Sequence, residues 1–267
     1  IAGNRAIYHE GWFARTIHRA PWEAKARRAL SDNSAWELFD VRSDFSLADD
    51  LAAKNPKKLA ELQKRFLTEA GKYHVLPMDD RVFERLDGAA MGRPDLMAGR
   101  TSITLAEGMT GMMEGVFPNV KNRSKVITAE IEVPASGGNG TVIAQGGRFG
   151  GWSLYVKDGV PAYDYNFLGL QRFTVTSAKK LQPGKSTVVF QFDYDGGGPA
   201  KGGKGTLLIN GKKVGEGRID ATQPGMFSAD ETADVGIDLG TPVVEAIGAE
   251  AKSRFTGRIP KLTVEVR

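Results

Sequence analysis

Short segments in which apolar and polar residues alternate fill the second half of this chain, and glycine-containing turns separate them. In residues 125–133 (KVITAEIEV) every second side chain is apolar, which is the period of a β-strand with one buried face. Asp158-Gly159 and Asn210-Gly211 each stand between two such segments, and both pairs suit the positive φ angles of a two-residue hairpin turn. About ten segments at a spacing of roughly 8–12 residues predict an antiparallel β-sandwich or jelly roll.

The first ninety residues differ in composition from the rest. They contain four of the 33 glycines, all three histidines and three of the four tryptophans. Residues 5–13, 16–22 and 36–40 have the aromatic-rich pattern of short strands or a hairpin. These few elements offer little apolar surface for an independent fold. This part is therefore expected to be the edge of a larger α/β domain.

One helix is well signalled between residues 55 and 71. Asn55 suits the N-cap, Pro56 suits the first helical position, and Gly71 suits the position just after the helix. The spacing of the apolar side chains predicts that one face of this helix packs on a neighbour. That face consists of Leu59, Leu62, Phe66 and Ala70.

Composition excludes several classes of protein. The absence of cysteine excludes disulfides, thiolate metal sites and a cysteine nucleophile within this chain. The 36 basic and 32 acidic residues are evenly spread, so no basic surface for nucleic acid is expected. No apolar run approaches the roughly 18 residues of a membrane span. The first residues lack both an initiator methionine and a secretory signal pattern, and we expect a piece of a longer protein.

Two parts of the chain carry a family resemblance. Residues 5–22 (RAIYHEGWFARTIHRAPW) and 36–81 (beginning WELFDVRSDF) resemble the C-terminal subdomain of bacterial arylsulfatases in the alkaline-phosphatase-like superfamily. Residues 92–112, NFLGLQRF at 166–173 and FSADETADVG at 227–236 resemble the concanavalin-A/laminin-G-like sandwich appended to a long subgroup of those enzymes.

The resemblance implies a fold and its division. The fold class is an α+β remnant of the sulfatase C-terminal subdomain, with a small antiparallel sheet plus a helix, followed by an antiparallel β-sandwich of the concanavalin-A-like jelly-roll type. The expected boundaries are 1–75 for the subdomain, 76–98 for a linker and 99–267 for the sandwich.

The resemblance also implies that this chain lacks the chemistry of the family. The family's nucleophile is a formylglycine made from the first residue of a C/S-x-P-x-R motif, and a calcium ion assists it. This chain has no cysteine, and none of its serines is followed by that pattern. No catalytic residue, metal ligand or cofactor is therefore expected here, and calcium is implied only for the parent enzyme. The implied partner is the N-terminal catalytic portion, covalently joined or as a separate cleaved chain, and a homo-oligomer is possible.

Two groups of residues are candidates for ligand contact. His18, Arg19 and Trp22 could reach the mouth of the implied active site, and the alternative is that they are polar and aromatic positions of an edge strand and its loop. In the sandwich, aromatic rings with amide and guanidinium donors could bind a glycan, and the alternative is core packing. The residues of this second group are Arg148, Trp152, Tyr163, Asn166 and Arg172.

The acidic residues of the sandwich offer weaker signals. Glu130 and Glu132 share one face of a strand but lack the pattern of paired glycosidase carboxylates, so a solvated face is expected. The run of Asp230, Glu231, Asp234 and Asp238 lacks the spacing of a calcium loop, and loop capping is expected instead.

Two classes of function remain. The first is the C-terminal part of a sulfatase that completes or shapes the catalytic domain without carrying its chemistry. The alternative is a carbohydrate-binding or structural β-sandwich module. The substrate of the implied parent, an aryl, alkyl or carbohydrate sulfate or another ester, stays open at this point, as does a location in the bacterial cytoplasm or periplasm.

Overall fold

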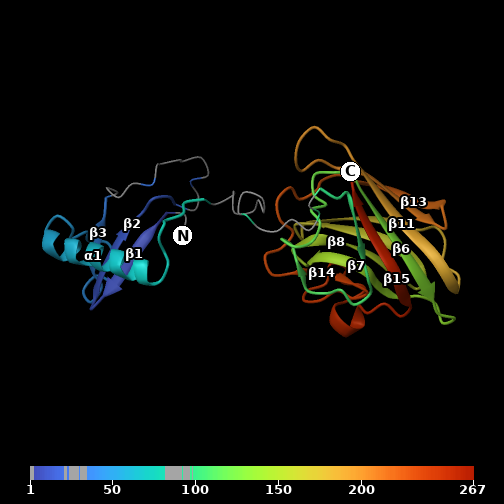
Figure 1. Cartoon of the computed structure of the whole chain (residues 1–267), viewed down its shortest axis with the longest axis horizontal. Coiled ribbons are helices and arrows are strands. Elements are labelled where there is room, and N and C mark those ends of the chain that lie inside the picture. Colours follow the sequence, from blue (N-terminus) through green and yellow to red (C-terminus); the bar gives the residue numbers. More distant parts are fainter. Residues whose placement is uncertain are drawn as a thin grey trace. The chain divides into compact units, whose positions relative to one another are not determined.

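The computed structural model describes residues 3–20, 23, 30, 35–81, 92, 97 and 99–267. The chain divides into two compact units, Ile1–Asp87 and Gly88–Arg267, and the division falls within residues 76–98. Figure 1 shows the elements of each unit. No helix in the described residues is long and apolar enough to cross a membrane.

The first unit contains a three-stranded antiparallel sheet and one helix. Strands β1 (Arg5–His9), β2 (Trp12–Thr16) and β3 (Glu37–Asp40) follow one another in the sheet, and helix α1 spans Pro56–Lys72. Side chains from the helix and from one face of the sheet form a small core. Its fully buried members are Ala14, Leu38 and Leu62.

The helix begins where the sequence predicts and ends later. Pro56 is its first residue, but the side chain of Asn55 donates to the carbonyl of Leu51 instead of capping the helix. Gly71 was expected after the helix and lies inside it. The N–H of Tyr73 donates to the carbonyl of Glu69, and this bond keeps the last turn helical through Lys72.

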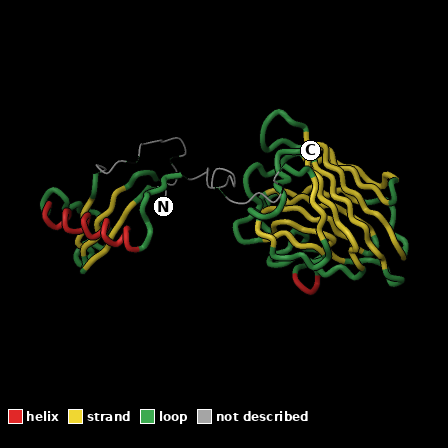
Figure 2. Tube along the Cα trace, viewed as in Figure 1, coloured by secondary structure: helices red, strands yellow, loops and turns green. Residues whose placement is uncertain are grey.

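The second unit consists of two six-stranded sheets, and every strand pair in them is antiparallel. Figure 2 shows the strands in yellow. The first sheet has the order β13-β12-β11-β6-β15-β4. Its strands are β4 (Ser102–Leu105), β6 (Lys125–Val133), β11 (Gly184–Tyr194), β12 (Gly203–Ile209), β13 (Lys212–Ile219) and β15 (Arg258–Val266).

The second sheet has the order β10-β9-β8-β7-β14-β5. Its strands are β5 (Met112–Met113), β7 (Gly140–Gly147), β8 (Gly150–Lys157), β9 (Val160–Phe167), β10 (Gln171–Thr176) and β14 (Thr232–Val235), and a short 3-10 helix η2 spans Glu250–Lys252. This arrangement confirms the predicted antiparallel β-sandwich. Asn210 and Asp158 have φ values of 50° and 52°, as the two Asn-Gly and Asp-Gly turns require.

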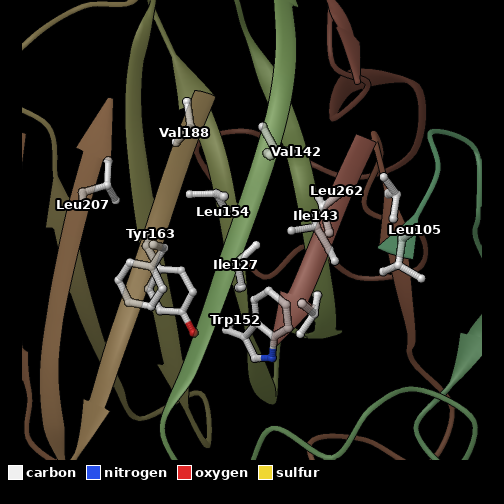
Figure 3. Packing of buried hydrophobic residues seen from close by; sticks show 14 of the residues in the cluster. Leu105, Ile127, Val142, Ile143, Trp152, Leu154, Tyr163, Val188, Leu207 and Leu262 are labelled. Carbon is white, nitrogen blue, oxygen red and sulfur yellow. The ribbon is translucent and has the colours of Figure 1, made fainter. Parts of the chain in front are cut away.

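The core lies between the two sheets (Figure 3). Tyr163 stacks on Phe190 of the opposite sheet, and Trp152 stacks on Tyr163 with 6.0 Å between ring centres. Alternate residues of each strand supply this core because successive side chains point to opposite faces. The burial of large aromatic and aliphatic side chains is the main stabilising term for a sandwich of this size.

The outer face of the second sheet is also covered. Residues 239–253, which we call the covering segment, place Val243, Val244 and Ile247 against the sheet, where they pack with Tyr155 and Ala162. Both faces of strands β7, β8 and β9 are therefore buried almost throughout. A ligand cannot reach this face over β7, β8 and β9 while the covering segment is in place, whereas Thr174 and Thr176 of the edge strand β10 are exposed.

Candidate functional site

The structure corrects the role of two predicted sandwich candidates. Trp152 and Tyr163 point inward from β8 and β9, and both side chains are completely buried between the sheets. The indole N–H of Trp152 donates to Oε1 of Gln145, 3.0 Å away. Neither ring can stack on a sugar, because both occupy inward positions of their strands.

Arg148, Asn166 and Arg172 do lie together, at one end of the second sheet. Asn166 is fully buried, and its Nδ2 donates to the carbonyls of Gly147 and Arg148 at 2.8 Å each. Its Oδ1 accepts from the N–H of Gly169 at 3.0 Å. Asn166 therefore ties the β7–β8 and β9–β10 turns to each other.

Arg172 holds the covering segment. Its guanidinium donates to the carbonyl of Val243 and lies 3.6 Å from the carboxylate of Glu245. Arg148 is exposed. Three of the five sandwich candidates therefore lie close together, but Asn166 and Arg172 form hydrogen bonds that hold the turns and the covering segment in place. Beside them the two turns expose three apolar side chains. These are Phe149, Leu168 and Leu170.

In the first unit His18 is buried and Arg19 is tied to its own loop. Nε2 of His18 lies 3.3 Å from Oδ2 of Asp80, and the backbone N–H groups of His18 and Arg19 both donate to Oδ1 of Asn4. Nε of Arg19 donates to the carbonyl of Glu23. Trp22 lies outside the described residues. A role of these residues at an active-site mouth stays a prediction.

The acidic run near β14 caps loops, as its spacing predicts. Glu231 accepts from the hydroxyl of Thr241 at 2.6 Å, and Oδ1 of Asp234 accepts from the N–H of Gly111 at 2.8 Å. Oδ2 of Asp238 accepts from the N–H of Val243 at 2.9 Å. No group of three acidic or histidine side chains in the described residues is arranged to hold a metal ion.

Asp238 is the exception within this run, because it is almost fully buried and its Oδ1 has no hydrogen-bond partner. Burial raises the pKa of Asp238 to about 7, and the carboxylates of Asp234, Glu231 and Glu250 raise it as well. The bond from the Val243 N–H acts in the opposite direction. Near neutral pH this carboxyl is therefore only partly ionised.

A buried lysine lies at the other side of the core. The Lys125 side chain extends from the first residue of β6, and its Nζ lies 5.2 Å from the ring centre of Trp152 and 5.4 Å from that of Phe192. No acidic side chain in the described part of the chain forms an ion pair with it. Burial lowers the pKa of Lys125 to about 7, with a smaller contribution from the charge of Lys121.

The candidate binding site is a cleft at one end of the sandwich, with a volume of about 470 Å³. Three segments form it: the loop between β10 and β11, the beginning of β11, and the β12–β13 turn. We call it the lysine cleft. Its lining consists of Lys179, Lys180, Gln182, Ser186, Ile209, Asn210, Lys212 and Val214.

A smaller cleft of about 290 Å³ adjoins the lysine cleft, since Ser186 and Asn210 line both. It also carries the carboxylates of Glu130 and Glu132. The combined surface therefore has ammonium groups at one end, the two carboxylates with the ammonium of Lys185 at the other, and uncharged polar groups between them. Such a surface offers both donors and acceptors to a polar ligand.

Sequence reasoning missed the lysine cleft. Its residues come from two stretches, 179–186 and 209–214, that no local pattern connects. The available signal was the recurrence of a Lys-Lys pair in each stretch, at 179–180 and at 212–213. Nothing in the sequence shows that one member of the second pair lines the same cleft as the first pair.

Comparisons with known proteins show no family for this chain. No protein-family model matches the chain, and no curated protein matches it. Among solved structures, the CBM40 domain of Ruminococcus gnavus IT-sialidase has a TM-score of 0.41 at 15% identity, covering 62% of this chain and 90% of that chain. Domains LG4-5 of the mouse laminin alpha1 chain have a TM-score of 0.40 at 17% identity, covering 62% of this chain and 44% of that chain.

A third solved structure is domain 4 of AbnA, a GH43 extracellular arabinanase from Geobacillus stearothermophilus, in complex with arabinotriose. Its TM-score is 0.39 at 16% identity, covering 62% of this chain and 66% of that chain. With TM-scores below 0.5, these neighbours carry no information on the ligand or the chemistry of this chain. The roles of individual residues rest on the geometry of this chain.

Proposed function

We propose that the second unit is an accessory carbohydrate-binding module and that the lysine cleft, with the smaller cleft beside it, is its binding site. The observation that carries this proposal is the lining of the lysine cleft. The lining combines amide, hydroxyl and ammonium groups from Gln182, Ser186 and the lysines with the apolar side chains of Ile209 and Val214. Sugars present hydroxyls at the edge of the ring and C–H groups on its faces, so such a lining matches both.

The test is a titration of the chain with a panel of neutral and anionic oligosaccharides, followed by backbone amide NMR. Saturable binding is expected, with the largest shift changes in residues 179–186 and 209–214. The exposed turns around Phe149 and Leu170 serve as the internal comparison and should change little. The proposal fails if no saccharide binds saturably, or if the changes centre on those turns.

We further propose that the chain forms the C-terminal part of a sulfatase. In support, the described residues of the first unit form the small antiparallel sheet and the helix that the resemblance leads us to expect in residues 1–75. The module would then complete or shape the catalytic domain, and the N-terminal catalytic portion would be its partner. The described residues offer no group of ligands for the calcium ion implied for that enzyme, so no step through calcium is assigned to this chain.

Because the nucleophile motif is absent, the chain by itself should not turn over an aryl sulfate. Groups that only position a substrate, without a nucleophile, lower the activation barrier of hydrolysis by only part of what a complete active site achieves. A chromogenic aryl sulfate assay of the purified chain, with and without added calcium, measures this. Turnover at the rate of a complete sulfatase would contradict the assignment, whereas activity restored to a catalytic portion by adding this chain would support it.

A further inference from the structure

Three lysines in the lysine cleft have no acidic partner among the described residues, whereas their neighbours do. Lys213 lies 2.8 Å from Glu216, and Lys185 lies 4.0 Å from Glu132. No ion pair in the described part of the chain involves Lys179, Lys180 or Lys212. Within residues 179–186 and 209–214, the lysines without an ion pair are thus the ones that line the cleft.

The backbone around these lysines is anchored. The N–H of Ala178 donates to the carbonyl of Val214 at 2.7 Å, and that of Leu181 donates to the carbonyl of Gly159 at 2.8 Å, so Lys179 and Lys180 lie between two fixed points. On the other side of the cleft, Oδ1 of Asn210 accepts from the N–H of Thr187 at 2.8 Å. This bond fixes the β12–β13 turn that carries Lys212.

Three like charges held at one cleft repel one another, and an anion bound among them removes that repulsion while gaining charge-assisted hydrogen bonds. The charges of the adjoining smaller cleft are largely balanced, because Lys185 lies 4.0 Å from Glu132 and Lys261 lies 3.9 Å from Glu130. It therefore offers no excess positive charge to a second anionic group, whereas Glu130 and Glu132 can accept hydrogen bonds from sugar hydroxyls. The distribution of charge therefore favours a ligand that is anionic at one end and neutral at the other.

We infer that the lysine cleft selects short carbohydrates with a single terminal anionic group, a sulfate or a carboxylate, which binds among Lys179, Lys180 and Lys212. This inference rests on the proposed carbohydrate-binding function and names its ligand class. The neutral part of the saccharide extends past Ser186 and Asn210 toward the two glutamates.

The test is calorimetric titration of the full chain with four versions of one tetrasaccharide: neutral, with one terminal sulfate, with one terminal carboxylate, and sulfated on every residue. One terminal anionic group is expected to raise affinity about tenfold over the neutral sugar at low salt, and physiological salt should reduce this gain. The sulfate and carboxylate versions show which source of the anion is preferred. The uniformly sulfated version should bind no better than the singly sulfated one at physiological salt.

Variants with matched controls decide whether the lysines act as a site. Lys212→Gln is expected to weaken binding of the singly anionic sugar about threefold to fivefold, and the double change K179Q/K180Q about tenfold. Lys213→Gln and Lys204→Gln remove the same charge from lysines that pair with Glu216 and line neither cleft, so they should change affinity by less than about twofold. Binding of the neutral sugar should stay the same in the two control variants, and in the two cleft variants it should fall less than binding of the singly anionic sugar.

The outcomes are distinguishable. If the neutral and anionic sugars bind equally, the inference fails and the carbohydrate-binding function stands. If no version binds, the proposed function itself fails. If Lys212→Gln and Lys213→Gln lose the same affinity for the singly anionic sugar, the lysines act only through diffuse charge attraction and the inferred site is wrong. If the uniformly sulfated sugar binds best, the role assigned to Glu130 and Glu132 is wrong.

Discussion

Replacing Lys125 with methionine is expected to stabilise the sandwich, although it removes a charged residue from a packed strand. The Lys125 ammonium is buried among aromatic rings without an acidic partner in the described residues, and burial lowers its pKa from 10.5 to about 7. A pKa difference of this size corresponds to about 5 kcal/mol at low pH, from which the surrounding rings subtract about 2 kcal/mol. Methionine fills similar space without a charge, so a gain of about 3 kcal/mol is expected at pH 6.

The sign of the pH dependence follows from proton binding. Between pH 7 and pH 10.5 the unfolded chain holds a proton at Lys125 that the folded chain has lost, so the stability of the wild type rises across this window. Below pH 7 the full cost of the buried ammonium is present. The advantage of the Lys125→Met variant should therefore be greatest at and below pH 6 and should vanish near pH 10.5.

The free energy of unfolding of the full chain is measured by urea denaturation, monitored through hydrogen exchange in peptides from β6. Lys121→Met is the matched control, since Lys121 is also buried but pairs with Glu114. Removing it leaves that carboxylate unpaired, and a loss of about 2–3 kcal/mol is expected. If Lys125→Met is less stable than the wild type, as Lys121→Met is expected to be, the aromatic rings stabilise the buried ammonium. The prediction that this ammonium destabilises the fold is then wrong.

Asp238→Asn is the second change with a large expected effect, and it should stabilise the sandwich at alkaline pH. The folded-state pKa of Asp238 is raised from 3.8 to about 7, so ionisation above pH 7 places an unpaired charge beside other carboxylates. Asparagine keeps the acceptor for the N–H of Val243 and can turn its NH₂ toward those carboxylates. A gain of about 2 kcal/mol at pH 8 is expected after allowing for partial solvation.

Between pH 3.8 and pH 7 the folded chain holds the extra proton at Asp238, so the stability of the wild type falls as pH rises through this window. The difference between Asp238→Asn and the wild type should therefore be small at pH 4 and complete above pH 7. Thermal unfolding across this pH range is the measurement.

Asp234→Asn is the control for this prediction. Both oxygens of Asp234 accept hydrogen bonds, one from the N–H of Gly111 at 2.8 Å and the other from the hydroxyl of Thr232 at 2.9 Å. The NH₂ group of an asparagine at this position would point at one of these donors and lose that hydrogen bond. A loss of about 1–2 kcal/mol is expected at pH 4, and above pH 7 it should be smaller because the change also removes the repulsion between Asp234 and Asp238. A pH-independent effect of Asp238→Asn would show that its carboxyl is not the group that titrates.

Much of the fold could be predicted from local pattern. The period of two in β6 and the Asn210-Gly211 turn follow from backbone geometry, which a few neighbouring residues determine. Pro56 marks the start of α1 for the same reason. The end of that helix was missed, since Gly71 continues the helix where no cap interrupts the hydrogen bonds.

The candidate site could not be predicted in the same way. Alternation divides a strand into two faces but does not say which face meets the other sheet. From the sequence alone, Trp152 and Tyr163 could therefore contact a glycan or pack in the core, and only the packing of the two sheets shows that they lie in the core. The covering segment over the outer face of the second sheet, and its bond from Arg172, depend on residues far apart in the sequence.

The sequence by itself determined that this chain forms short antiparallel strands joined by glycine turns, preceded by a part with one amphipathic helix and no sulfatase nucleophile motif. Only the tertiary structure decided where the charged groups lie. It brought Lys212 to the cleft of Lys179 and Lys180, paired Lys213 with Glu216, and buried Lys125 without an acidic partner in the described residues. Charges interact through space, and the spacing of residues along a chain does not fix the distances between strands.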